Sequence, residues 1–474
     1  MTSDRVLVVD LDGTLLRSNI LFETFWSAFS IRWTTPFLAA NSLMQGRAAL
    51  KRCLAELSAV EAASLPYNDD VVAYIQHWRA EGGRTVLVTA TNQVLAEEIA
   101  AHLGIFDEVH GSDETDNLKG VRKAAFLEQR FGNRGFTYMG DAEADLPVWG
   151  KAVKAITVNV SRPLRARVEA LGGEVEHITS QASTVNPYLK ALRPHQWLKN
   201  LLVFMPMLLA HQLTSETGLQ SLLAFIVFGL VASSAYVVND LLDLASDRAH
   251  SRKRNRPFAA GKLPIAHGTW LAPLLLLAGL LIALTLGGQF VLVMFVYYVA
   301  TTAYSLYLKR RLVIDICTLA GLYTLRVIAG GAATGISLSV WLLAFSIFFF
   351  FALAAIKRQA ELVDGVATAK ADIHGRGYHV DDLPLVTNMA ISSGYVSVLV
   401  MALYLNSPAV QEFYTTPLVL WGICPVLLYW LSRMVMVAHR GNMHDDPMIF
   451  AMKDRISQMC LFMILAFAIV GALL

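Results

Sequence analysis

The sequence predicts a soluble α/β domain followed by an all-α bundle of about nine transmembrane helices. Hydrophobic residues make up 55% of the 474 residues and charged residues only 16%. Up to about residue 187, charged and apolar residues are mixed as in soluble domains, whereas long apolar runs dominate from about residue 197. We therefore expect a domain at 1–160, a polar linker at 161–190 and a membrane domain at 191–474.

Short apolar runs rich in β-branched residues predict a parallel sheet in the first domain. The runs are RVLVVDLDG, RTVLVTAT, FTYMGD and AITVNV, and helix-like stretches separate them. Runs of this kind are buried on both faces, so a Rossmann-like α/β fold is expected. A helical, aromatic-rich insertion at about 20–66 is either a cap over the strand ends or an ordinary packed helical pair.

The second half contains roughly nine apolar segments, each about long enough to cross the hydrocarbon core. They are expected near 198–213, 218–238, 268–286, 289–308, 314–334, 338–356, 384–405, 416–437 and 457–473. Lysine and arginine gather in alternate loops, while the loops at 211–217, 286–289, 334–339 and 406–416 contain none. Because positively charged loops stay in the cytosol, we expect a multi-pass protein of the cytoplasmic (inner) membrane, with its first domain and polar loops cytoplasmic.

Composition excludes several other classes of protein. A net charge of +2, with no basic run interleaved with aromatics, argues against nucleic acid as a partner. The four cysteines lie far apart and form no CxxC pair, which fits neither a zinc site nor a disulfide framework. The N-terminal apolar stretch is short and interrupted by aspartates, so it is not expected to be a secretory signal.

Acidic residues follow two of the predicted strands. Asp10 and Asp12 end the first strand in DLDGT, and Asp141 and Asp145 follow a later strand in GDAEAD. Parallel strands present their active sites at this edge of the sheet. One carboxylate can attack phosphorus while another moves the proton, and the second acidic pair could close a magnesium site against Asp10.

These motifs resemble the haloacid dehalogenase (HAD) superfamily of phosphohydrolases. The resemblance implies that Asp10 is the nucleophile and Asp12 the general acid/base, with Asp10, Asp12 and Asp141 around magnesium. It also implies phosphate binding by Thr89 and by a lysine, for which Lys123 fits the family context better than Lys119. Because nucleophile and acid/base are both aspartates, the family pattern favours a phosphomonoesterase over a dehalogenase.

A second acidic run, NDLLDLASD, follows the second apolar segment. On a helix, Asn239, Asp240, Asp243 and Asp247 fall within an arc of about 100°. Such a face at the end of a span is costly unless it holds cations, and magnesium shared with substrate phosphates is the natural occupant. The alternative is a solvated helix end, which the basic residues that follow at once make less favourable: Arg248, His250, Lys253 and Arg256.

This run resembles the first aspartate-rich motif of the UbiA superfamily of intramembrane prenyltransferases. Further polar loops contribute to the match: RPHQWLKN, DRAHSRKRNRP, YSLYLKRRLVID, KRQAE and DDPMIFAMKDR. Members that prenylate aromatic acceptors usually carry a second aspartate-rich motif, whereas here Asp315 stands alone. The combination looks like the branch that transfers phosphoribose from phosphoribosyl diphosphate (PRPP) to a polyprenyl phosphate.

The resemblance implies magnesium at Asp240, Asp243 and Asp247, with Asp315 as a further candidate ligand. The implied substrate-binding residues are basic or polar and come from the motifs quoted above: Arg193, Lys199, Asn239, Lys253, Arg256, Tyr304, Lys309, Lys357 and Arg358. Two other readings stay open. The chain could move a polyprenyl chain from its diphosphate to an aromatic acceptor, or its membrane half could only anchor a phosphatase. The sequence also leaves a homo-oligomer open.

Overall fold

A computed structural model describes residues 5–112, 118–179, 186–250, 253–367, 377–407, 410, 414–443 and 446–473. The chain divides into two compact units. Unit 1 comprises Met1–Leu192 and Tyr236–Pro273, and unit 2 comprises Arg193–Ala235 and Leu274–Leu474. The first stretch of unit 1 ends at Leu192, and the segment with the acidic run also packs in unit 1.

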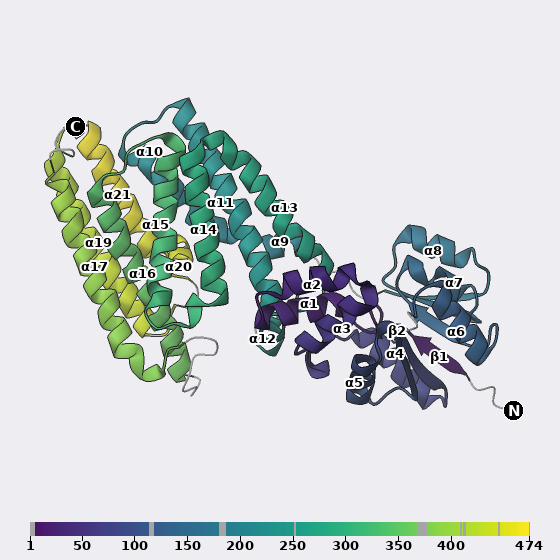
Figure 1. The fold of residues 1–474 in the computed structure, drawn as a ribbon. Helices are drawn as coiled ribbons and strands as arrows, with labels where there is room; N and C mark the ends of the chain where they lie inside the picture. Colours follow the sequence, from purple (N-terminus) through teal and green to yellow (C-terminus); the bar gives the residue numbers. More distant parts are fainter. Residues whose placement is uncertain are drawn as a thin grey trace. The chain divides into compact units, whose positions relative to one another are not determined.

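Unit 1 contains a six-stranded parallel sheet (Figure 1). The strands are β1 (Val6–Val9), β2 (Arg84–Asn92), β3 (Glu108–Ser112), β4 (Thr137–Gly140), β5 (Lys154–Val158) and β6 (Glu174–Ile178). Their order is β3-β2-β1-β4-β5-β6, as expected for a Rossmann-like fold. The chain order reverses at β1, so the ends of β1 and β4 flank the crevice where such sheets bind ligands.

Side-chain alternation along β1 gives the sheet a core on each face. Leu7 and Val9 pack on one side with α4 (Asp69–Ala80) and α5 (Gln93–Leu103). Val6 and Val8 pack on the other with α6 (Val121–Phe131), α7 (Leu146–Trp149) and α8 (Arg162–Glu169). All four residues of β1 are buried, which explains the continuous apolar run in the sequence.

The expected linker at 161–190 is wrong for most of its length. Residues 162–178 form α8 and β6, and β6 extends the sheet by pairing with β5. β6 is the edge strand of the sheet, and its side chains are only partly buried or exposed. Because such a strand can be polar, its sequence resembles that of a linker. α9 (Pro187–Leu192) follows.

The insertion after β1 is helical, as expected. It forms α1 (Ile20–Ile31), α2 (Thr35–Met44), α3 (Arg47–Leu57) and the short η1 (Ala62–Ser64). Asn19 caps α1 by accepting a hydrogen bond from the amide of Leu21 at 3.1 Å. Trp26 of α1 belongs to an apolar core with Leu241, Phe258 and Ile265. The insertion therefore packs against the segment 236–273 within unit 1.

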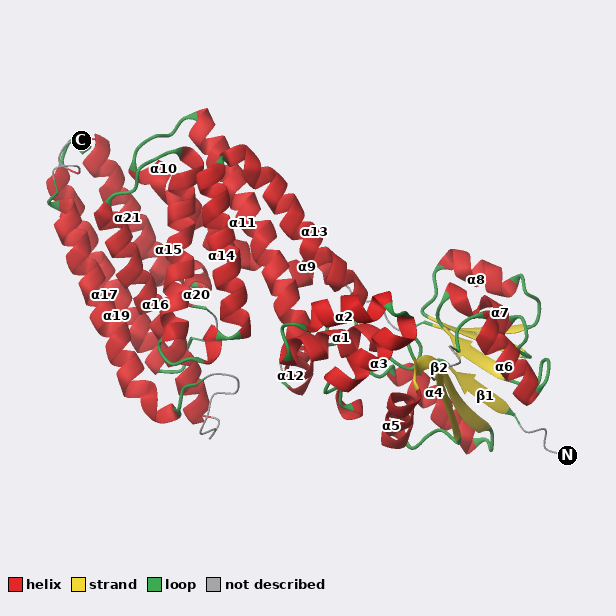
Figure 2. Cartoon of the chain, viewed as in Figure 1, coloured by secondary structure: helices red, strands yellow, loops and turns green. Residues whose placement is uncertain are grey.

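Eight helices among the described residues are long and apolar enough to cross a membrane, and Figure 2 shows this part as helices and loops. The helices are α11 (Ser215–Leu242), α13 (Ile265–Ala283) with η5 (Leu284–Leu286), α14 (Gly288–Leu306), α15 (Ile314–Thr334), α16 (Val340–Ala367), α17 (Leu383–Leu405), η8 (Pro417–Gly422) with α19 (Ile423–His439), and α21 (Arg455–Leu473). The expected multi-pass helical bundle is confirmed, but not its count of nine.

The first expected span, 198–213, does not form one long helix. The chain forms η3 (Pro194–Phe204) and then α10 (Met205–Leu209), with Pro206 at the junction. Proline lacks an amide donor and its ring opposes continuation of a preceding α-helix, so an apolar run containing it need not form a straight span. The shorter elements elsewhere are α12 (Leu244–Ala249), η4 (Lys253–Asn255), η6 (Leu308–Arg310), η7 (Val380–Asp382) and α20 (Pro447–Lys453).

α15 packs closely on η3 at Gly330. A Cβ atom built there would collide with the carbonyl oxygen of Val203, whereas one at Gly321 of the same helix would meet nothing within 4 Å. Small residues at such positions let helices approach closely in membranes.

We expect Gly330→Ala to destabilise the protein by about 1–3 kcal/mol, because the backbone of η3 must move to relieve the overlap. Thermal unfolding in detergent measures the change. Gly321→Ala is the matched control and should unfold at or above the wild-type temperature. Equal melting temperatures for the two variants would contradict the packing described.

Candidate active sites

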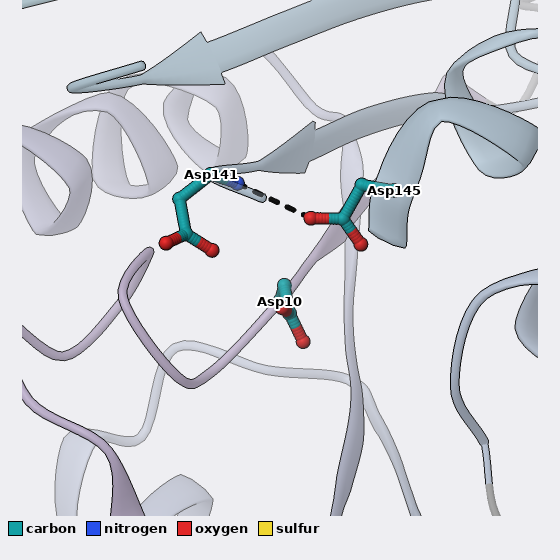
Figure 3. Close-up of side chains that lie close together, drawn as sticks. All are labelled: Asp10, Asp141 and Asp145. Atoms are coloured by element: carbon teal, nitrogen blue, oxygen red, sulfur yellow. Dashed lines mark hydrogen bonds between the residues drawn. The ribbon is translucent and has the colours of Figure 1, made fainter. Parts of the chain in front are cut away.

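Three carboxylates meet where β1 and β4 end (Figure 3). Asp10 follows β1, while Asp141 and Asp145 come from the turn after β4 and the short helical segment that follows. Each offers an oxygen, and these oxygens all lie within 4.8 Å of one another. The topology thus brings together residues that are more than 130 positions apart in the chain.

A hydrogen-bonded chain fixes these side chains. The Nζ atom of Lys123 donates to Oδ1 of Asp10 at 2.7 Å and to the hydroxyl of Tyr138 at 3.1 Å. That hydroxyl donates to Oδ1 of Asp145 at 2.8 Å, and Oδ2 of Asp145 accepts from the amides of Asp141 and Ala142. Of the two candidate lysines, Lys123 contacts Asp10, although Lys119 also lines the pocket.

Asp12 is separate from the carboxylate trio. Its Oδ1 accepts from the amide of Ile20 at 2.7 Å, and its Oδ2 accepts from the hydroxyl of Thr91 at 3.4 Å. Burial raises the pKa of Asp12 to about 6, with the Asp10 carboxylate adding to it and the Ile20 amide opposing it. A carboxyl group with this pKa can both give and take a proton near neutral pH, as a general acid/base must.

The trio carries excess negative charge. Burial raises the pKa of Asp141 to about 8, and the nearby carboxylates of Asp10 and Asp145 add to the effect. Burial and Asp10 also raise the pKa of Asp145. Gly13 has a left-handed backbone (φ +80°), and a side chain there would run into the Asp141 carboxylate. Three close, poorly solvated oxygens next to a glycine turn fit a small oxygen-binding cation such as magnesium.

Thr89 does not lie where the sequence analysis expected it. Its side chain is fully buried, and its hydroxyl oxygen accepts from the amide of Thr91 at 3.0 Å. Thr91 lines the pocket, while Thr89 is absent from its lining. The ladder between β2 and β3 is irregular between Val88 and Asn92, the stretch that contains both threonines. Likewise Asp145, rather than Asp12, completes the cluster of possible metal ligands.

The second acidic run lies at the junction of α11 and α12. Asp240 ends the buried face of α11, and Asp247 is buried in α12. Nη1 of Arg256 bridges them, donating to Oδ1 of Asp240 at 3.1 Å and to Oδ2 of Asp247 at 2.6 Å. Asp243 lies between the two helices, half-buried like Asn239, and Lys253 is exposed in η4. Among the described residues, these carboxylates do not meet as closely as the Asp10 trio.

The chemistry of this junction still fits a cation. Oδ1 of Asp247 is buried and has no hydrogen-bond partner among the described residues. Burial raises the pKa of Asp247 even though Arg256 opposes the effect. The guanidinium of Arg256 therefore does not fully compensate the Asp247 carboxylate, and a divalent ion would provide the additional positive charge.

Unit 2 contains a basic cluster around one buried carboxylate. Oδ2 of Asp446 accepts from Nζ of Lys199 at 2.8 Å and from Nζ of Lys357 at 3.1 Å, and the hydroxyl of Tyr323 donates to both Asp446 oxygens. Burial opposes ionisation of Asp446, but Lys357 and Lys199 outweigh it and hold its pKa below the usual range. The cluster unites η3, α15, α16 and the turn before α20.

Asp315 is not available in the way the sequence analysis expected. It is fully buried, forms an ion pair with Nη2 of Arg358 at 2.5 Å, and accepts from the hydroxyl of Tyr378 at 2.6 Å. Arg358 is itself fully buried and also pairs with Glu361. Both residues thus make internal contacts between α15 and α16, and their ligand-binding roles stay predictions.

The remaining predicted residues lie at helix ends. Arg193 precedes η3 with a left-handed backbone (φ 52°), Tyr304 is in the last turn of α14, and Lys309 is in η6. Arg326, inside α15, is buried and donates to Asn200, to the carbonyl of Leu322 and to the hydroxyl of Tyr297.

Comparison with known proteins agrees with both halves of this description. The profile of the UbiA prenyltransferase family matches residues 201–470, more than half of the chain. The chain belongs to the UbiA prenyltransferase family. A second profile, that of haloacid dehalogenase-like hydrolases, matches residues 7–149. This UbiA protein therefore carries an N-terminal HAD domain, as the two resemblances in the sequence predicted.

Three relatives of this UbiA protein cover it to different extents. The protein y4nM of Sinorhizobium fredii is 38% identical over 454 residues, which is 95% of this chain and 88% of the relative. Nodulation protein NoeC of Azorhizobium caulinodans is 36% identical over 274 residues, 58% of this chain and 89% of the relative. Decaprenyl-phosphate phosphoribosyltransferase of Mycolicibacterium smegmatis is 42% identical over 183 residues, 38% of this chain and 58% of the relative.

We expect the magnesium affinity of the HAD site to rise as pH increases from 6 to 8. The raised pKa of Asp141, about 8, means that this carboxyl is mostly protonated at pH 6, and a metal ion must displace the proton. Calorimetric titration of the Asp240→Asn variant, in which the UbiA acidic run is weakened, should show affinity increasing by about tenfold or more over this range. A pH-independent affinity would contradict this electrostatic description.

We expect Asp446→Asn to destabilise unit 2 by about 3–5 kcal/mol, because Lys199 and Lys357 would lose the buried carboxylate between them. Thermal unfolding in detergent measures the loss. Asp381→Asn removes an exposed carboxylate that pairs with His379 and is the matched control, with an expected cost of about 0–1 kcal/mol. Similar melting temperatures for both variants would show that the cluster contributes little.

Proposed function

We propose that the protein transfers 5-phosphoribose from PRPP to a polyprenyl phosphate, releasing diphosphate, and that its HAD domain removes the 5-phosphate from the lipid-linked product. The observation that carries the proposal is that Asp315 already forms contacts within the protein. A conventional prenyltransferase usually needs a second acidic motif there, but this carboxylate is buried against Arg358 and Tyr378. The partial likeness to decaprenyl-phosphate phosphoribosyltransferases supports the same choice.

In the transfer step, the bond between the anomeric carbon and the diphosphate oxygen breaks, and a bond from that carbon to an oxygen of the lipid phosphate forms. Negative charge grows on the departing diphosphate. Asp240, Asp243 and Asp247 would hold magnesium, which supplies positive charge to the diphosphate when bound. Arg256, which donates to Asp240 and Asp247, would add positive charge beside the diphosphate.

In the phosphatase step, an oxygen of Asp10 attacks phosphorus and the bond to the sugar oxygen breaks. Asp12 gives its proton to that leaving oxygen and then takes one from the water that hydrolyses the aspartyl phosphate. Lys123 donates a hydrogen bond to the attacking carboxylate and would offset the charge of the phosphate. Asp10, Asp141 and Asp145 would hold the magnesium, which shields the incoming phosphate from these carboxylates.

The proposed location is the cytoplasmic membrane, with both active sites on the cytosolic side. The segregation of lysine and arginine into alternate loops supports this orientation. PRPP is a soluble, highly charged donor and would arrive from the cytosol, whereas the polyprenyl phosphate would arrive laterally within the bilayer. A tethered phosphatase would then meet the product at high effective concentration.

Purified protein given labelled PRPP, polyprenyl phosphate and magnesium should form a labelled, dephosphorylated lipid. Asp240→Asn should abolish transfer, because it removes a carboxylate of the proposed metal site. Asp10→Asn should leave transfer intact and make the phosphorylated lipid accumulate. Thin-layer chromatography and mass spectrometry of the lipid fraction measure both outcomes.

Glu98→Gln removes an exposed carboxylate on α5 and is the control, with both steps expected at the wild-type rate. Absence of labelled lipid would refute the transferase proposal. Transfer of a prenyl chain from its diphosphate to an aromatic acceptor would establish the conventional activity instead. Loss of transfer in Asp10→Asn alone would refute the division of labour between the two sites.

A further inference from the structure

Residues from three parts of the chain line the pocket next to the HAD carboxylates. Its volume is about 580 Å³, within the range of small-molecule sites. Asp10, Asp12 and Lys123 lie at its base, and Leu43 and Leu50 of the cap helices α2 and α3 form a second side. Its remaining lining includes Pro264–Ala266, which belong to the region matched by the UbiA profile. The phosphatase pocket is therefore completed by the transferase part of the chain.

The segment Pro264–Ala266 is also the start of a membrane span. α13 begins at Ile265, and the candidate span continues to Leu286. A span of about 20 residues uses its whole length to cross the hydrocarbon, so its first residues lie at the membrane interface. This wall of the pocket is therefore expected at the level of the lipid headgroups.

A buried ion pair holds the cap to this region. Nη1 and Nη2 of Arg248 donate to the two carboxylate oxygens of Glu23 on α1, at 3.1 and 2.6 Å, and its Nε donates to the carbonyl of Ala259. The side chain of Glu23 is only 3% exposed and that of Arg248 10%. Because this ion pair has two hydrogen bonds and little exposure to solvent, it fixes both the distance and the orientation between α1 and α12.

Apolar packing reinforces the ion pair. Nε1 of Trp26 donates to the hydroxyl of Thr269 at 2.9 Å, one turn beyond the pocket wall. The indole also packs in a common core with Phe258 and Ile265. Because opening the cap would expose this core and separate a buried charge pair, the wall is a fixed part of the pocket.

We propose that Pro264–Ala266 is the substrate-selecting wall of the phosphatase pocket, and that it favours a phosphate monoester carried on a membrane lipid over the same ester free in water. The inference rests on the phosphatase activity proposed above and adds the residues that set its specificity. The phosphate lies on Asp10 and Lys123, the sugar lies against the wall, and the lipid phosphate remains at the interface where α13 begins. Ala266, half-buried and small, leaves room for the sugar.

The test compares two substrates with the same 5-phosphate. One is a synthetic farnesyl-phosphoryl ribose 5-phosphate in nanodiscs that contain the full-length protein, and the other is ribose 5-phosphate in solution. Phosphate release should give a kcat/KM at least about tenfold higher for the lipid-linked ester, the selectivity that contacts with one pocket wall can supply. The lipid is provided ready-made and PRPP is omitted, so the result is independent of the transfer reaction.

Ala266→Trp should lower the ratio of the two kcat/KM values about tenfold, because the indole would fill the space assigned to the sugar. Ala170→Trp, at an exposed position outside the pocket, is the matched control and should keep the wild-type ratio. A wild-type ratio near one, or a ratio that Ala266→Trp leaves unchanged, would overturn the role of the wall while the phosphatase proposal stands. Failure to hydrolyse either ester would overturn both.

Discussion

An ionised side chain that leaves water must be compensated, and this requirement organises both units. Arg256 spans Asp240 and Asp247, Arg248 closes on Glu23, and Arg358 closes on Asp315. Two lysines share Asp446. An uncompensated charge in such places costs several kcal/mol, so each pair fixes the segments that carry it. The polar loops that look like a set of ligand-binding motifs are thus partly the framework that holds the helices together.

The HAD site departs from this rule because its carboxylates are not fully compensated, and this departure points to metal binding. Among the described residues, three carboxylates meet there, and Lys123 donates to one of them, Asp10. Burial raises the pKa of Asp141, the neighbouring carboxylates add to the effect, and a bound cation would oppose it. At the junction of α11 and α12, the unsatisfied oxygen of Asp247 is a smaller imbalance of the same kind. These carboxylates with too little nearby positive charge are the candidates for metal binding.

The division of the chain into compact units does not follow the division into families. The segment Tyr236–Pro273 lies within the UbiA match, yet it packs with the HAD domain. The same segment contains Asp240, Asp247 and Arg256 of the second acidic site and Pro264–Ala266 of the HAD pocket. The two proposed reactions therefore share one structural segment, which gives a physical basis for their occurrence in one chain.

The sequence by itself determined the two-part organisation, because alternating β-branched runs and long apolar runs are local patterns. It also determined the acidic and basic motifs, since DLDGT, GDAEAD and NDLLDLASD place their carboxylates within a few residues. Only the tertiary structure decided which of these residues meet. Thr91 rather than Thr89 lines the pocket, and Asp315 of α15 pairs with the buried Arg358 of α16. The lysine on Asp10 and the pocket wall at Pro264–Ala266 depend on contacts between residues more than 100 positions apart, which no local pattern encodes.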